Sequence, residues 1–140
     1  MATQRTGGLT GPSPRVVLDS GAVIGLARSD LRARAALAAA HEAGAEIVVP
    51  AVVVAETVRG AARDAPVNRV LKAVGNVAEV DEECARVAGG LLGSTRSSGT
   101  VDALVVATAV VAGGAVILTG DPDDLRRLAE RHTEVVVQAL

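Results

Sequence analysis

The chain has 140 residues, a net charge of −2 and an apolar fraction of 49%, which together are typical of one globular domain of ordinary size. It contains no Phe, Tyr or Trp, and this excludes modules that bind single-stranded nucleic acid by stacking bases on aromatic rings. The single cysteine, Cys84, excludes an internal disulfide and a cysteine-based zinc site, and it is typical of a reducing compartment.

The N-terminal residues differ in composition from the rest of the chain. Residues 1–14 are rich in Gly, Ser, Thr and Pro and contain no apolar run, so we expect a flexible tail that is not a signal peptide. Residues 15–140 contain no repeat or linker and are predicted to form a single domain. No stretch approaches the roughly 18 apolar residues of a membrane span, so we expect no membrane contact and a cytoplasmic location.

Short β-branched runs alternate with helical patterns through the first half of the domain. Strands are indicated by Val/Ile/Leu runs, and helix ends by Gly44 and Pro50. In chain order we predict a strand at 16–18, helices at 22–27 and 31–43, a strand at 47–49, helices at 52–62 and 67–74, and a short edge strand at 77–80.

The second half continues the alternation. Asp81 is predicted to cap an amphipathic helix whose apolar stripe includes Cys84 and Leu91. The segment SSGT then forms a turn, with Thr100 as the N-cap of the next helix. The remaining predicted elements are that helix at 101–112, a strand at 116–118, a helix at 123–130 and a strand at 134–137. This alternation predicts an α/β fold, a three-layer α/β/α sandwich with a mainly parallel central sheet.

Four carboxylates fall near positions where predicted strands end, and open parallel sheets bind ligands outside those ends. Asp19 directly follows the first strand, and Asp121 follows the fourth apolar strand by two residues. Glu56 lies in the helix after the second strand, and Asp102 lies in the first turn of the helix that begins near Thr100.

Three of these carboxylates also have a structural interpretation. Asp19 and Asp121 would suit the N-caps of the helices that follow them. For Asp121, Pro122 at the first helical position and Asp124 three residues later strengthen this alternative. Asp102 would be favoured by the helix dipole at a helix N-terminus.

Glu56 is harder to explain structurally, because it stands mid-helix among valines. Burial of an unpaired ionised carboxylate costs several kcal/mol, so the side chain would need a partner, a proton or a metal. The alternative is a thin solvated stripe shared with Arg59 or Arg63.

A cluster of these four carboxylates in one cleft would repel itself unless a cation bound there. Oxygen ligands without a Cys or His cluster favour Mg²⁺ or Mn²⁺ over zinc. A divalent cation held in this way is suited to the hydrolysis of a phosphodiester. Thr119 and Ser20 would add hydroxyl contacts to bound water or phosphate, although such residues at strand ends are often turn formers.

Four segments together resemble the PIN-domain family, and more narrowly the VapC-type ribonuclease toxins of bacterial toxin–antitoxin pairs. They are VVLDSGAVIGLA, VVVAETVRG, GTVDALVVATA and VILTGDPDDLRRLA, and they span nearly the whole predicted domain. The resemblance implies a PIN-like fold and a metal site formed by Asp19, Glu56, Asp102 and Asp121, with Asp124 in a secondary role.

The same resemblance implies an activity and partners. The expected activity is that of a Mg²⁺-dependent endoribonuclease acting as a toxin, with Mn²⁺ as the alternative ion. The expected partners are a second copy of the chain and a small antitoxin whose C-terminal segment blocks the cleft. Arg28, Arg59 and Arg96 are basic residues close to the motifs in sequence and are the candidates for RNA contact; the alternative is that they are solvated surface residues.

Two other classes of function are alternatives to a toxin. The first is a catalytically silent PIN-fold interaction module that binds an antitoxin-like peptide or RNA. The second is a phosphoryl-transfer domain of the haloacid-dehalogenase or receiver type. The dehalogenase site would need an Asp where Gly21 stands, and the receiver would need a Lys after a late strand, whereas the only Lys is Lys72.

Overall fold

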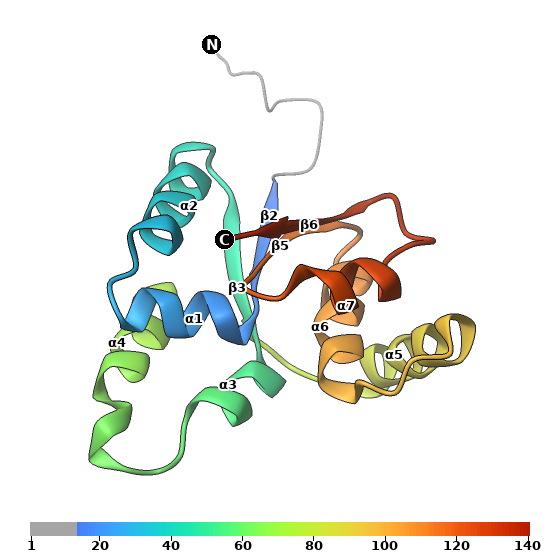
Figure 1. Cartoon of the computed structure of the whole chain (residues 1–140), viewed down its shortest axis with the longest axis horizontal. Helices are drawn as coiled ribbons and strands as arrows, with labels where there is room; N and C mark the ends of the chain where they lie inside the picture. Colours follow the sequence, from blue (N-terminus) through green and yellow to red (C-terminus); the bar gives the residue numbers. More distant parts are fainter. Residues whose placement is uncertain (1–13) are drawn as a thin grey trace.

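The computed structural model describes residues 14–140 (Figure 1). Five parallel strands form one sheet in the order β4-β3-β2-β5-β6. The strands are β2 (Arg15–Leu18), β3 (Glu46–Pro50), β4 (Val77–Ala78), β5 (Ala115–Thr119) and β6 (Val135–Ala139). The predicted tail at 1–14 lies outside the described residues except for Pro14, so it stays a prediction.

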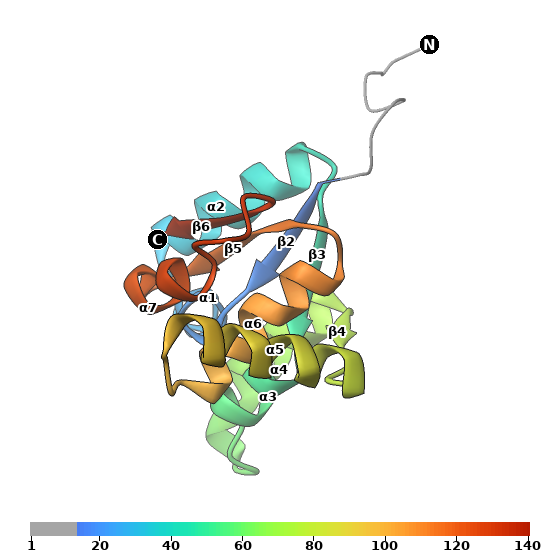
Figure 2. The same ribbon diagram turned by 90° about the vertical axis from the view of Figure 1, so that its right-hand side faces the viewer.

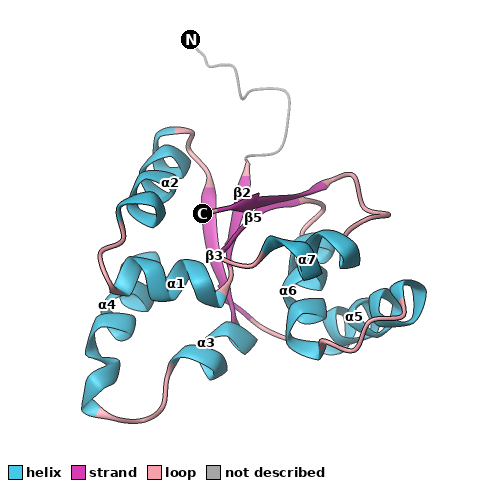
Figure 3. Ribbon diagram, viewed as in Figure 1, coloured by secondary structure: helices cyan, strands magenta, loops and turns pink. Residues whose placement is uncertain are grey.

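Helices cover both faces of the sheet. They are α1 (Ser20–Ala27), α2 (Leu31–Glu42), α3 (Ala51–Thr57), α4 (Ala65–Val74), α5 (Glu82–Thr95), α6 (Thr100–Val111) and α7 (Pro122–Leu128), with a 3-10 turn η2 (Ala62–Asp64). Figures 1 and 2 show α1, α2 and α4 on one face and α5, α6 and α7 on the other. Figure 3 shows the strands enclosed between these two layers, which confirms the predicted three-layer α/β/α fold.

The core is built from aliphatic side chains on the central strands and on α6. Val17, Leu18 and Ile117 have no more than 3% of their surface exposed, because β2 and β5 are covered on both faces. This burial explains why these strands appear in the sequence as continuous apolar runs instead of alternating patterns. Within residues 14–140, no helix is long and apolar enough to cross a membrane.

Most predicted elements are present with their ends shifted by at most two residues, but the helix predicted at 52–62 is too long. α3 ends at Thr57, and the chain then forms a loop around a buried carboxylate. Asp64 Oδ2 accepts hydrogen bonds from three successive backbone N–H groups, those of Arg59, Gly60 and Ala61, at 3.0, 2.7 and 3.1 Å. These bonds lower the pKa of Asp64, the bond from Ala61 contributing most. They replace the helical hydrogen bonds that a longer α3 would make.

The two predicted caps around α5 and α6 have different outcomes. Asp81 caps α5 through a hydrogen bond from the backbone N–H of Cys84 to Oδ1 at 2.9 Å, as predicted. Thr100 is not the cap of α6, because it is already the first helical residue and Gly99 holds the N-cap position without a side-chain bond. α6 therefore starts one residue early and places Asp102 in its first turn.

Candidate functional site

Asp19 lies at the junction of β2 and α1 with only 7% of its surface exposed. Its Oδ1 accepts a hydrogen bond from the backbone N–H of Ser20 at 2.8 Å, which caps α1. Its Oδ2 accepts a second bond, at 2.9 Å, from the hydroxyl of Thr119. The capping interpretation is thus correct for Asp19, and the second bond fixes the carboxylate against the neighbouring strand β5.

Thr119 is the last residue of β5 and is fully buried. Besides donating to Asp19, its hydroxyl accepts a hydrogen bond from the backbone N–H of Asp121 at 3.0 Å. The sequence suggested that this hydroxyl would contact bound water or phosphate. In the structure its two hydrogen-bond partners are Asp19 and the backbone of Asp121, so it positions two acidic segments.

A close approach of two glycines brings the same segments together. A Cβ on Gly21, at the start of α1, would lie 2.8 Å from the backbone nitrogen of Gly120. Real Cβ atoms do not come this close to backbone, so only glycine fits at this position. The start of α1 therefore packs directly on the turn between β5 and α7, which carries Asp121.

Glu56 lies in the last turn of α3 and not mid-helix as predicted, and it is exposed, which agrees with the alternative of a solvated position. The reason is the early end of α3. The carboxylate accepts a hydrogen bond from the hydroxyl of Ser20 at 2.7 Å, and that hydroxyl lies 3.4 Å from Asp19 Oδ1. The guanidinium of Arg59 turns away and donates to the carbonyl oxygens of Ala55 and Val58 at 2.9 and 3.1 Å.

The remaining carboxylates lie at the N-terminal ends of α6 and α7. Asp121 holds the N-cap position of α7, but its side chain makes no capping bond and is exposed. Asp124 lies in the first turn of α7, and Asp102 lies in the first turn of α6. The capping interpretation of Asp121 is therefore not supported, and its carboxylate stays available for another partner.

Partial burial and the negative charges of these residues raise the pKa of Asp102. Its pKa is raised to about 6, first by partial burial and then by the negative charges of Asp19, Asp124, Glu56 and Asp121. No basic side chain contributes to this shift. Four other carboxylates, from three segments of the chain, thus each destabilise the ionised form of Asp102.

The negative charge and the oxygen donors of these carboxylates suit a divalent cation that prefers oxygen ligands. Among residues 14–140, no three Asp, Glu, His or Cys side chains lie close enough to form a complete set of metal ligands. Mg²⁺ is usually held by one or two carboxylates while it retains several waters, so a widely spaced acidic set fits this ion better than zinc. A bound cation would also relieve the repulsion that raises the pKa of Asp102.

A cleft of about 340 Å³ opens beside Asp102. It is lined by Arg96, Ser97, Ser98, Gly99, Asp102, Asp124, Arg127 and Leu128. Of the three arginines predicted to contact RNA, only Arg96 lines this cleft; Arg28 and Arg59 do not. Sequence reasoning missed Arg127, although its spacing of three residues from Asp124 on a helix places the two on one face.

Comparison with known proteins identifies the family. The PIN domain family model matches residues 16–131. Among solved structures, the fold is similar to VapBC2 from Rickettsia felis bound to a promoter DNA fragment, with a TM-score of 0.71, 12% identity, and coverage of 90% of this chain and 98% of that chain. It is also similar to a toxin–antitoxin complex from Klebsiella pneumoniae, with a TM-score of 0.66, 19% identity, and coverage of 86% and 95%.

A third similar structure is FitAcB from Neisseria gonorrhoeae, with a TM-score of 0.63, 17% identity, and coverage of 87% of this chain and 95% of that chain. At these identities the likeness is one of fold. The comparison with curated proteins finds no match. The family model extends from β2 into the segment after α7 and includes all the acidic residues described above. This chain belongs to the PIN domain family.

Proposed function

We propose that this chain is a Mg²⁺-dependent endoribonuclease, with Mn²⁺ as an alternative ion, that acts as the toxin of a toxin–antitoxin pair. The observation that carries the proposal is the gathering of carboxylates at one edge of the sheet, where Thr119 ties Asp19 to the segment of Asp121 and Ser20 ties Glu56 to Asp19. Partial burial and the negative charge of these carboxylates raise the pKa of Asp102. Such a self-repelling group lowers stability in the absence of a cation, so it is expected where a cation has a role.

Asp19, Glu56, Asp102 and Asp121 would hold the ion, one or two of them directly and the others through its bound waters, with Asp124 nearby. When bound, a divalent cation supplies Lewis-acid stabilisation of the charge that develops on a phosphodiester during hydrolysis.

Two hydroxyl groups position this acidic set. Thr119 fixes Asp19 through Oδ2, and its bond from the backbone N–H of Asp121 keeps the start of α7 against β5. Ser20 donates to Glu56 Oε1 and thereby holds the end of α3 close to Asp19. The carboxyl of Asp102 must lose its proton before it can act as a ligand, so its raised pKa links ion binding to pH.

A paired substitution on α7 tests the nuclease assignment. Asp121→Asn should lower RNA cleavage in Mg²⁺ by about a hundred-fold or more, since loss of a few kcal/mol of transition-state stabilisation has this effect. Asp123→Asn is the matched control, because Asp123 is an exposed carboxylate in the same turn that does not contribute to the pKa shift of Asp102. Equal cleavage by the two variants would contradict the assignment.

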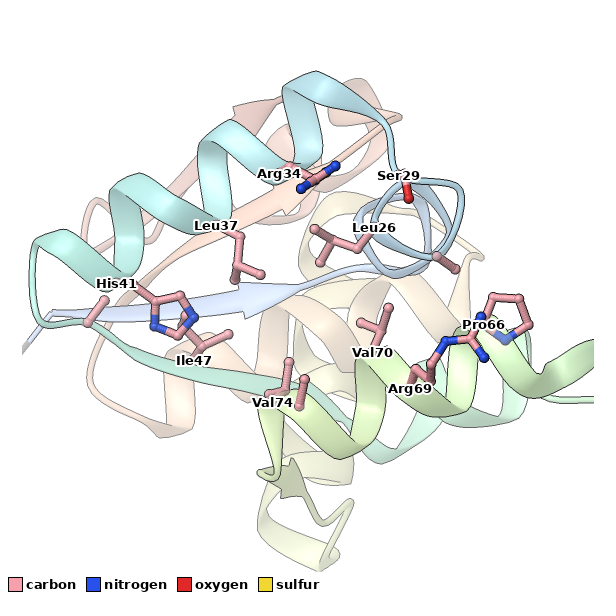
Figure 4. A pocket seen from close by; sticks show the side chains of 13 residues that line it. Leu26, Ser29, Arg34, Leu37, His41, Ile47, Pro66, Arg69, Val70 and Val74 are labelled. Carbon is pink, nitrogen blue, oxygen red and sulfur yellow. The ribbon is translucent and has the colours of Figure 1, made fainter.

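An antitoxin partner is proposed from the similar complexes and from a second surface. A groove of about 450 Å³ lies between α1, α2 and α4, on the face opposite α5 and α6. Figure 4 shows the apolar side chains of Leu26, Leu37, Val70 and Val74 pointing into it. Arg34, His41 and Arg69 also line it. An apolar groove with basic side chains suits an amphipathic segment that carries acidic residues.

Substitutions on α2 test this partner. Leu37→Glu places a charge in the groove and should leave RNA cleavage intact while the co-expressed cognate antitoxin no longer neutralises it. Leu31→Glu is the matched control, since Leu31 is on the same helix with 79% of its surface exposed and does not line the groove. Neutralisation of the Leu37→Glu variant at the wild-type level would contradict this use of the groove.

The homodimer is likewise a proposal. Light scattering during gel filtration should give twice the 14.0 kDa mass of a single chain, and a monomer at micromolar concentration would contradict it. The catalytically silent interaction module is the alternative function, and the groove between α1, α2 and α4 favours it as much as it favours a toxin. The two functions differ in RNA cleavage, which only the toxin would show.

A further inference from the structure

Arg96 holds an unusual backbone conformation at the end of α5. Its φ of 53° and ψ of 40° are left-handed, and its backbone N–H closes the helix on the carbonyl of Leu92. Glycine is the usual residue in this conformation at a helix end, because a Cβ is disfavoured there. The side chain carried by this strained position lines the cleft beside Asp102.

Hydrogen bonds tie the end of α5 to the residues that follow it and to α7. The hydroxyl of Thr95, which is buried, donates to the carbonyl of Leu91 at 2.7 Å and lies 2.8 Å from the hydroxyl of Ser97. The backbone N–H of Ser97 donates to the carbonyl of Leu92 at 3.1 Å. The carbonyl of Thr95 in turn accepts a bond from Nη2 of Arg127 on α7 at 3.1 Å. This last bond brings the guanidinium of Arg127 to the loop that carries Arg96.

Neither arginine is neutralised by a carboxylate. The ion pairs among residues 14–140 are Arg15–Glu46, Arg86–Glu82 and His132–Glu134. Asp102 and Asp124 line the same 340 Å³ cleft as Arg96 and Arg127, yet they form no ion pair with them. The cleft therefore presents two carboxylates and two guanidinium groups that form no ion pair to one ligand.

We propose that Arg96 and Arg127 bind the phosphate of a nucleotide that neighbours the scissile bond of the RNA substrate. The inference rests on the proposed nuclease function. Guanidinium groups bind phosphate oxygens through paired hydrogen bonds, and a strand that crosses the cleft would place the next phosphate beside the carboxylates. The hydroxyls of Ser97 and Ser98 in the same cleft add further donors to phosphate or ribose.

This placement predicts which arginines affect RNA binding. Arg127→Gln should weaken binding of a single-stranded RNA oligonucleotide several-fold in EDTA, where no cleavage occurs. It should also raise KM in Mg²⁺ with kcat nearly unchanged, as expected when uniform binding is lost. Each lost phosphate contact should reduce the slope of log K against log salt concentration by about 0.7.

Arg126→Gln is the matched control. Arg126 is the adjacent residue on α7, is exposed, and also donates to a backbone carbonyl, that of Val137 at 3.3 Å, but it does not line the cleft. It should therefore leave the salt slope unchanged. Arg127→Lys keeps the charge without the planar fork, so it should restore the salt slope but only part of the affinity.

Because Arg127 also holds the carbonyl of Thr95, Arg96→Gly is the second variant. Glycine suits the left-handed backbone at this position, so this variant should fold and still lose RNA affinity and salt slope. Wild-type affinity, KM and salt slope in both Arg96→Gly and Arg127→Gln, in a wild-type protein that cuts RNA, would overturn the inference and leave the nuclease function standing. A wild-type protein that neither binds nor cuts RNA would overturn the proposed function and the inference with it.

Discussion

The hydroxyl of Thr119 donates a hydrogen bond to Oδ2 of Asp19 at 2.9 Å, joining the ends of β5 and β2 across 100 residues of sequence. The two strands are adjacent and parallel, so their carboxyl ends meet at one edge of the sheet. The same hydroxyl also accepts from the backbone N–H of Asp121. One buried side chain thus fixes the relative positions of two proposed ligands.

Thr119→Val tests the hydrogen bonds of Thr119 separately from its packing, because valine has nearly the same shape but no hydroxyl. It leaves an oxygen of Asp19 and the backbone N–H of Asp121 without their partner, which costs about 1–3 kcal/mol of stability. RNA cleavage should fall at least about ten-fold, as for other residues that orient metal ligands. Thermal unfolding and cleavage assays check both effects. Thr119→Ser keeps the hydroxyl and should retain most of the activity; equal loss in both variants would point to packing instead.

Asp102 should make the stability of the metal-free protein depend on pH. Its pKa is about 6 in the folded protein and near the ordinary value of 3.8 in the unfolded chain. The folded state therefore binds this proton more tightly, and the stability contributed by Asp102 is fully present below about pH 4 and is lost as the pH rises through 6. In EDTA, Asp102→Asn should be close to wild type in Tm at pH 4 and more stable than wild type at pH 7.

The cation should reverse this order at pH 7. Saturating Mg²⁺ should raise the Tm of the wild type above that of Asp102→Asn, because only the wild type retains the full acidic set. Asp123→Asn serves as the control and should show neither the pH-dependent difference nor the reversal. A constant difference in Tm between wild type and Asp102→Asn from pH 4 to 7 would refute the role of repulsion at Asp102.

The contact between Gly21 and Gly120 predicts opposite effects for two similar substitutions. Gly21→Ala should destabilise the protein by about 1–3 kcal/mol, since its Cβ would lie 2.8 Å from the backbone nitrogen of Gly120. It should also reduce cleavage by displacing Asp19 from Asp121. Gly90→Ala, in an exposed part of α5 with no atom within 4 Å of the added Cβ, should stabilise by up to about 1 kcal/mol. Denaturant unfolding measures both changes, and a stable, active Gly21→Ala variant would rule out the close contact.

Replacing Arg96 by glycine should raise the stability of the protein while it lowers RNA affinity. Arg96→Gly should raise stability by up to about 1 kcal/mol, because glycine relieves the left-handed strain at the end of α5. Arg86→Gly, the same substitution inside the same helix, should lower stability by about 1 kcal/mol. Urea unfolding of both variants is the measurement. If Arg96→Gly were destabilising by as much as Arg86→Gly, the conformation of Arg96 would not be strained.

The sequence was sufficient to predict the sheet, because each buried strand is an uninterrupted run of Val, Ile and Leu and each crossover carries a helical pattern. The end of α3 was not predictable in this way. It is set by Asp64, which accepts hydrogen bonds from three backbone N–H groups. Since every residue except proline has a backbone N–H, such partners cannot be recognised from the residue types. Because the predicted helix ran on to residue 62, Glu56 was placed mid-helix, whereas it lies in the last turn of α3 beside Ser20.

The arginines show a second limit of sequence reasoning. Arg28 and Arg59 are close to the acidic motifs along the chain but do not line the cleft. Arg126 and Arg127 both lie within the motif of Asp121, and only the packing of α7 beside the end of α5 shows that Arg127 lines the cleft and Arg126 does not. Proximity in sequence does not report the packing of two helices. Arg96 was found because it precedes Asp102 by only six residues, yet its left-handed backbone was visible only in the structure.

The most direct test of the account is RNA cleavage by the purified chain, freed of any antitoxin, in Mg²⁺ or Mn²⁺ and in EDTA, beside Asp19→Asn. The account predicts cutting by the wild type that stops in EDTA, returns when the cation is restored, and is absent from a folded Asp19→Asn protein. Cleavage that persists in EDTA, or that the folded Asp19→Asn protein retains, would contradict a cation-dependent site built on Asp19.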